Sequence, residues 1–110
     1  MTTKVRIRMF PCGNVSEIRV SGTIDERYMV MADSSTCDKA RRFVEGLGLL
    51  TLEDLTDKKK SRIFRDFIDS DMSANCLMLP GVITAAWAEA GMIAASAKRR
   101  GEPLSIEFID

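Results

Sequence analysis

The sequence predicts an α+β fold: a single domain over residues 1–110, in which a three-stranded antiparallel meander packs on helices. Apolar and polar residues alternate with period two in the first third of the chain, which is typical of half-buried strands. From residue 38 to residue 99 the apolar residues recur at helical spacing instead. The length of 110 residues and the hydrophobic content of 45% are those of one average globular domain.

Three segments of the first third are expected to be strands. Residues 4–9 and 16–21 alternate between apolar side chains and charged or hydroxyl-bearing ones. Residues 28–32 are more uniformly apolar, which favours a central position in the sheet. The two short intervening segments are rich in Pro, Gly, Asn and Asp, which favour tight turns. Consecutive strands should therefore pair antiparallel.

Two capping patterns predict the next helices. Ser35 at an N-cap position places Asp38 three residues later, and this helix would end near residues 46–48, where two glycines stand. A second capping box at residues 51–54 opens a segment of helical spacing that runs to residue 69, with three consecutive lysines on a solvated face. The first helix would bury Ala40, Phe43, Val44 and Leu47.

The last third of the chain predicts one long helix and one further strand. Pro80 suits a first helical turn, and apolar residues recur at helical spacing as far as Arg99. Gly101 is a natural C-terminal stop after a basic last turn. In the tail, residues 104–108 alternate again between apolar and polar side chains. This pattern predicts a C-terminal fourth strand.

Composition and charge exclude several classes of protein. The 16 Lys and Arg residues balance the 16 Asp and Glu residues, which argues against a nucleic-acid-binding domain. The chain has no histidine, so Ser/His and Cys/His catalytic arrangements cannot form within it. Residues 72–97 are poor in charge but contain Asn75, Pro80 and Glu89, which argues against a membrane-spanning helix. The charged N-terminus is unlike a signal peptide, so we expect a cytoplasmic protein with reduced thiols.

The three cysteines occupy positions that favour chemistry. Cys12 falls in the turn after the first strand, Cys37 at the start of the first helix, and Cys76 shortly before the long helix. Helix N-termini stabilise thiolates, and thiolates bind metals and clusters. The alternative is that the cysteines are small buried hydrophobic residues, because the chain contains no Cys-x-x-Cys pair.

This arrangement resembles the IscU/NifU N-terminal scaffold family of iron–sulfur cluster assembly. The likeness rests on Cys12-Gly13-Asn14, on Cys37 after 24 intervening residues, and on Cys76 after 38 more. Phe43-Val44-Glu45-Gly46, Thr51-Leu52-Glu53-Asp54 and the Ala-rich segment after Cys76 extend it over residues 9–97. The sequence patterns of Cys76 to Pro80 and of Ala88-Glu-Ala-Gly91 are also similar to those of a small family of uncharacterised prokaryotic domains.

The chain departs from the scaffold pattern beside two of the cysteines. The family's acidic residue after Cys-Gly is replaced by Asn14, and its histidine before the third cysteine by Asn75. Asp71-Met-Ser-Ala74 stands in place of the family's chaperone-recruiting segment. These replacements imply that the family's ordinary donor cycle is not shared.

The resemblance implies an IscU-like fold and a binding or scaffold protein without turnover of its own. Cys12, Cys37 and Cys76 would hold an iron–sulfur cluster or a zinc or iron ion, with Asp38 as the nearest acidic ligand. A sulfur donor or a cluster acceptor protein would be the partner. The alternatives are a non-catalytic interaction protein with structural cysteines and a thiol enzyme or sulfur carrier. A strand edge carrying Met29 and Met31 would permit homodimer formation.

Overall fold

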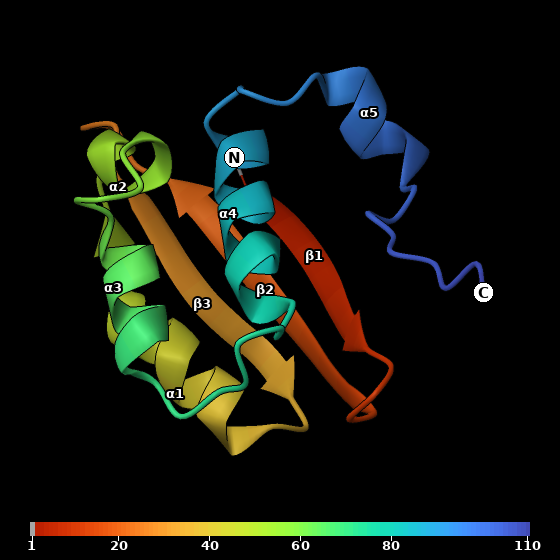
Figure 1. Ribbon diagram of the computed structural model, residues 1–110. Helices are drawn as coiled ribbons and strands as arrows, with labels where there is room; N and C mark the ends of the chain where they lie inside the picture. Colours follow the sequence, from red (N-terminus) through yellow and green to blue (C-terminus); the bar gives the residue numbers. More distant parts are fainter. Residues whose placement is uncertain (1) are drawn as a thin grey trace.

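The computed structural model describes residues 2–110, so that of the expected domain 1–110 only Met1 lies outside the described residues. The order of elements is three strands, one helix, a very short strand and four further helices (Figure 1). The strands are β1 (Thr2–Met9), β2 (Asn14–Gly22), β3 (Tyr28–Ser35) and β4 (Leu49–Leu50). The helices are α1 (Asp38–Leu47), α2 (Leu52–Thr56), α3 (Arg62–Asp69), α4 (Met78–Glu89) and α5 (Ala95–Arg100).

The strands form one antiparallel sheet in the order β1-β2-β3-β4. This confirms the predicted α+β class and the antiparallel meander on helices. The helices α1 to α4 cover one face of the sheet (Figure 1), and the other face carries the charged side chains of β1 and β2. β3 lies between β2 and β4, as its predicted central position requires, and its side chains alternate, with Met29 and Met31 on the open face. The core lies between the sheet and the helices, with Ile18, Val20, Val44, Leu47, Ile63, Val82, Ala85 and Ala86 at its centre.

Helix α4 approaches the sheet closely at Gly81. A Cβ atom at this position would overlap Cδ1 and Cγ1 of Ile7 in β1, so any larger residue requires the packed Ile7 side chain or the helix to shift. The far end of α4 is fixed by Glu89, which accepts hydrogen bonds from the Thr3 hydroxyl at 2.9 Å and from the Gly22 N–H at 3.0 Å. Both ends of α4 are thus held against the sheet.

The fourth strand is β4 and not the C-terminal segment, so the prediction for residues 104–108 is wrong. Gly48, at φ 56°, turns the chain after α1, and its carbonyl accepts the N–H of Val30 at 2.9 Å. Leu49 and Leu50 can then pair with Met29 and Tyr28. Residues 102–110 form no regular structure and are exposed, because the described core is already closed without them.

The prediction of one long helix over residues 80–99 is wrong, because this part of the chain forms two helices, α4 and α5. α4 begins two residues earlier, at Met78, and ends at Glu89. Gly91 then adopts φ 80°, and the N–H of Met92 bonds back to the Trp87 carbonyl at 2.9 Å. The helix is broken at a residue whose conformation suits glycine.

The two earlier helix predictions are correct in place but not in extent. The first helix has Cys37 rather than Ser35 as its N-cap, and it ends before Gly48. The capping box at Thr51 and Asp54 is present, but α2 ends at Thr56. A turn containing the three lysines follows, and Ser61 caps a separate helix, α3.

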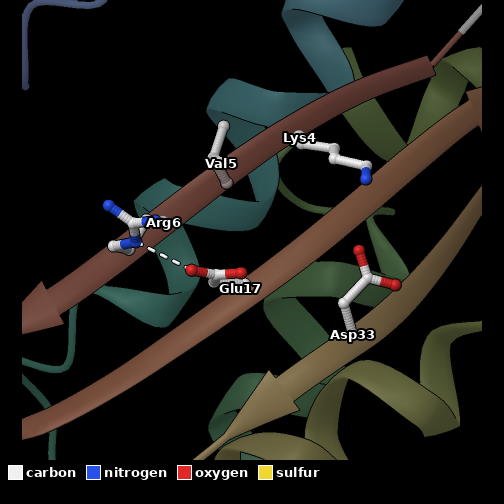
Figure 2. A pocket seen from close by; sticks show the side chains of 5 residues that line it. All are labelled: Lys4, Val5, Arg6, Glu17 and Asp33. Atoms are coloured by element: carbon white, nitrogen blue, oxygen red, sulfur yellow. Dashed lines mark hydrogen bonds and ion pairs between the residues drawn. The ribbon is translucent and has the colours of Figure 1, made fainter.

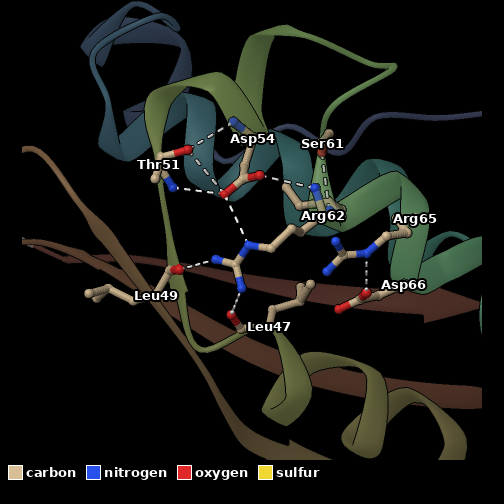
Figure 3. Close-up of polar contacts among 9 residues, drawn as sticks. Leu47, Leu49, Thr51, Asp54, Ser61, Arg62, Arg65 and Asp66 are labelled. Carbon is tan, nitrogen blue, oxygen red and sulfur yellow. Dashed lines mark hydrogen bonds and ion pairs between the residues drawn. The ribbon is translucent and has the colours of Figure 1, made fainter.

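Asp54 and Arg62 join four elements (Figure 3). The Asp54 carboxylate accepts the N–H of Thr51 at 2.9 Å, the N–H of Arg62 at 3.0 Å and Nε of Arg62 at 3.4 Å. The Arg62 guanidinium also donates to the carbonyl of Leu47 at 3.3 Å and to that of Leu49. Burial alone would raise the pKa of Asp54, but the donors from Thr51 and Arg62 outweigh it and lower that pKa.

We expect Asp54→Asn to destabilise the fold at neutral pH by about 1–3 kcal/mol, because it weakens a buried hydrogen-bond network. Since the folded-state pKa is lowered, the carboxylate contributes its full stability above the unfolded value of about 3.9, and this contribution is lost as the pH falls further. Urea denaturation at neutral and acidic pH measures both effects. The exposed neighbour Glu53→Gln is the control, and an equal loss in both variants would contradict this role.

Gly81→Ala should destabilise the protein by about 1–3 kcal/mol, because the new methyl group overlaps Ile7 in a packed core. The matched control is Gly46→Ala in α1, where a Cβ meets no atom within 4 Å. That variant should be more stable by about 0.5–1 kcal/mol, since alanine costs less backbone entropy in a helix. Thermal denaturation of the two variants checks the opposite signs.

Candidate thiolate site

The three cysteines line a single small cavity at one end of the sheet. Cys12 lies in the turn between β1 and β2, Cys37 immediately precedes α1, and Cys76 lies two residues before α4. The cavity has a volume of about 30 Å³. The structure therefore brings together three thiols that are far apart in the sequence. The other lining residues are Ile7, Met9, Asn14, Ser16, Ala40, Leu77 and Met78.

Cys12 is exposed, and its thiol belongs to a polar chain across the end of the sheet. Gly13 at φ 72° tightens the turn, and its N–H bonds to the Met9 carbonyl at 2.8 Å. The Asn14 side chain donates from Nδ2 to the Cys12 sulfur at 3.3 Å and accepts at Oδ1 from the Thr36 hydroxyl at 3.0 Å. The Asn14 amide is thereby oriented with its N–H toward the thiol.

Cys37 is the N-cap residue of α1, and its side chain makes no capping hydrogen bond. The Ser35 hydroxyl accepts the N–H of Cys37 at 3.1 Å and donates to the Cys37 carbonyl at 3.0 Å. Ser35 Oγ lies 2.8 Å from Ser16 Oγ on β2, which ties this segment to the sheet. The thiol of Cys37 is thus held at the N-terminal end of a ten-residue helix.

Cys76 is half-buried next to the first turn of α4. Its N–H bonds to the Ser73 carbonyl at 3.0 Å. Burial raises the pKa of the Cys76 thiol, and the nearby thiols of Cys12 and Cys37 raise it further against the opposing N–H of Met78. Burial and the two neighbouring thiols therefore disfavour the charged form of Cys76.

The expected acidic ligand is not part of the cavity wall. Asp38 is the first residue of α1 and is exposed, and it is absent from the residues that line the cavity. Within residues 2–110, no three side chains among Cys, Asp and Glu are already arranged to hold a metal ion. Binding of a metal ion would require the thiols to move closer together.

A larger hollow of about 290 Å³ lies on the open face of the sheet (Figure 2). Its wall includes Lys4, Arg6, Glu17 and Asp33, and Arg6 Nε lies 2.8 Å from Glu17 Oε2. Positive and negative side chains face one another across this surface, and no cysteine lines it. The thiol cavity is therefore the better candidate site, although it is smaller.

Glu89 has a structural role that its place in the sequence does not indicate. Glu89 is half-buried and holds α4 against β1 and β2 through Thr3 and Gly22. A carboxylate within an alanine-rich helix was the available signal. Its partners are 86 and 67 residues away, so the pattern alone could not identify them.

Comparison with protein families assigns most of the chain to one of them. The model of DUF6951, a family of unknown function, matches residues 3–100. The chain belongs to this family. The match includes the three cysteines of the DUF6951 chain and excludes its C-terminal tail. No curated protein and no solved structure matches it. Among the described residues of this DUF6951 protein, no helix is long and apolar enough to cross a membrane.

Alkylation of the DUF6951 protein by iodoacetamide should modify Cys12 first and Cys76 last. Cys12 is exposed, whereas burial both shields Cys76 and raises its pKa. We expect at least about a tenfold difference in rate at mildly alkaline pH, since the thiolate is the reactive form. Peptide mass spectrometry over a time course measures it, and denatured protein is the control. Equal rates in the native protein would contradict the described environments.

Proposed function

We propose that this protein binds a metal ion or an iron–sulfur cluster through Cys12, Cys37 and Cys76. The observation that carries the proposal is that all three thiols of the chain line one cavity. Cys12 lies in a turn between strands, and Cys37 and Cys76 lie next to the starts of two helices. Along the chain, 24 residues separate the first cysteine from the second, and 38 separate the second from the third. Three converging thiols are a donor set suited to zinc, iron and iron–sulfur clusters.

Each of the three sulfur atoms has one nearby feature that would favour a bound thiolate, although burial opposes the charged form at Cys76. Nδ2 of Asn14 faces the sulfur of Cys12, and the N–H of Met78 donates to Cys76. Cys37 lies at the positive end of the α1 dipole. N–H donors around metal-bound thiolates stabilise their charge and orient them. Bound metal would supply the positive charge that keeps Cys76 deprotonated, against the effect of burial.

The likeness to the IscU/NifU N-terminal scaffolds supports a role in handling iron–sulfur clusters. In that family the three cysteines are expected in a turn after the first strand, at the start of the helix after the meander, and at the start of a late helix. Here those positions are held by Cys12, Cys37 and Cys76. On this proposal a sulfur donor or a cluster acceptor protein is the partner. The site would work in the cytoplasm, where thiols stay reduced.

The fourth coordination position is assigned to water or to a ligand from the partner. Asp38 does not line the cavity, and Asn14 offers an amide where the scaffold family has an acidic residue. A site with three protein ligands keeps one position open, which suits a protein that receives or passes on its cargo.

A second candidate is an interaction protein in which the cysteines serve only in packing. The observation that favours it is that Cys37 and Cys76 pack against the hydrophobic core. Small half-buried thiols commonly play that role. The two candidates differ in whether the purified chain carries metal.

Protein purified without oxygen, or reconstituted with ferrous iron and sulfide, should be brown or should contain about one equivalent of zinc or iron per chain. Elemental analysis and visible absorption measure this. Cys37→Ser and Cys76→Ser each remove a proposed ligand and should lower the affinity for the metal by more than about 100-fold. Loss of a group that only hydrogen-bonds to a ligand typically costs about 10- to 100-fold. Asn14→Ala should cost about tenfold, because only a donor to Cys12 is lost.

Asp38→Asn is the matched control for the ligand set and should leave the metal content unchanged, since Asp38 lies outside the cavity. Circular dichroism establishes that each variant is folded. A colourless, metal-free protein whose three thiols react only after unfolding would overturn the proposal and favour structural cysteines.

A further inference from the structure

Strand β1 is an open edge of the sheet. In the order β1-β2-β3-β4, the described residues place a neighbour on only one side of β1. The opposite edge is different, because β4 covers Tyr28 and Met29 of β3. The edge expected at Met29 and Met31 is therefore partly closed. Backbone N–H and C=O groups along an open edge strand can pair with an added strand.

The C-terminal tail, residues 102–110, has the pattern of a strand but no partner among the described residues. Leu104, Ile106 and Phe108 alternate with polar side chains and are 73%, 84% and 87% exposed. A series of large apolar side chains in solvent marks an interaction segment. The family match ends at residue 100, so this segment lies outside the shared domain.

The charges of the tail and of β1 are complementary. The side chains of Lys4, Arg6 and Arg8 stand on the open face of β1 (Figure 2 includes the first two). The tail carries Glu102, Glu107 and Asp110 and no basic residue, and in a strand only Glu107 of the three lies on the side opposite to Leu104, Ile106 and Phe108. A tail strand on the β1 edge can direct Glu107 toward the basic face, and its alternate apolar residues then face the helix side.

The helix side of the β1 edge has apolar surface that such a strand would cover. Val5 and Met9 point to that side and are only half-buried, whereas Ile7 between them is buried. The apolar residues of the tail would extend this row across the edge. Pairing, apolar burial and charge thus favour the same orientation of the tail.

We propose that two copies of this chain form a two-fold symmetric dimer, in which the tail of each copy adds as a strand to β1 of the other. The chain's own tail follows α5, which is already fixed to β1 because Lys98 Nζ donates to Thr3 Oγ1 at 2.9 Å. In spite of this attachment, the tail leaves both its own apolar residues and the β1 edge uncovered (Figure 1). A tail from a second copy reaches the edge without that connection, and reciprocal exchange satisfies both edges at once.

Size-exclusion chromatography with light scattering tests the dimer, using the full chain under reducing conditions so that disulfides cannot link the copies. The full chain should be dimeric at high concentration and dissociate on dilution. A chain ending at Gly101 should be monomeric, and because residues 102–110 are exposed this truncation leaves the core intact. Ile106→Asp should have the same effect.

Two further comparisons make the test specific to the β1 edge. Lys4→Glu combined with Arg8→Glu should weaken the dimer by about tenfold, and adding Glu107→Lys to the same chain should restore it. Ile24→Asp is the matched control, because Ile24 is also an exposed isoleucine but lies in the turn between β2 and β3.

The proposal is overturned if the full chain remains monomeric at every concentration. It is also overturned if the chain ending at Gly101 still forms a dimer. A monomer in which hydrogen exchange of the tail is slow would mean that the tail pairs within its own chain. Metal content is measured separately on the same samples, so this result is independent of the thiolate site.

Discussion

The close contact of α4 with the sheet is the constraint on which the site depends. Gly81 has no side chain, so α4 can lie directly against Ile7 of β1. Glu89 fixes the other end of the helix to Thr3 and Gly22. With both ends held, the N-terminal end of α4 is brought to the end of β1, where Cys76 meets the turn that carries Cys12. A larger residue at position 81 would overlap Ile7 and disturb this packing next to the thiol cavity, which Ile7 also lines.

The three thiols share a cavity but differ in their surroundings. Cys12 is exposed beside an oriented amide, Cys37 starts a helix, and Cys76 is half-buried with a raised pKa. If the protein binds a metal ion as proposed, the exposed thiol of Cys12 would be the one that the ion reaches most easily. The small cavity volume and the separation from Asp38 mean that the chain itself offers sulfur and little oxygen. If the site binds a metal ion as proposed, this donor chemistry would favour thiophilic metals.

Features with a local cause were predictable from the sequence, and features with a distant cause were not. The strands, the capping box at Thr51 and the positions of the three cysteines follow from neighbouring residues. The convergence of the thiols could be expected only through a family resemblance. The pairing of β4 depends on a turn at Gly48 and on a strand 20 residues earlier. In the tail the alternation was recognised, but the residues that would bury it are not in the chain's own core.

The hydroxyl of Thr3 serves two elements at once, since it donates to Glu89 and accepts from Lys98. Helix α5 buries no side chain of its own, so this shared hydroxyl is its main polar attachment to the sheet. Release of Lys98 breaks one partly buried hydrogen bond, and no residue of α5 is fully buried, so the free-energy cost of this opening is small compared with that of opening the core. Residues 91–110 form an arm that contributes no residue to the buried core, so this arm can open locally while the core stays folded. Local opening of this arm should precede global unfolding. The exposed tail could then reach the β1 edge of a second copy while the three thiols stay in place.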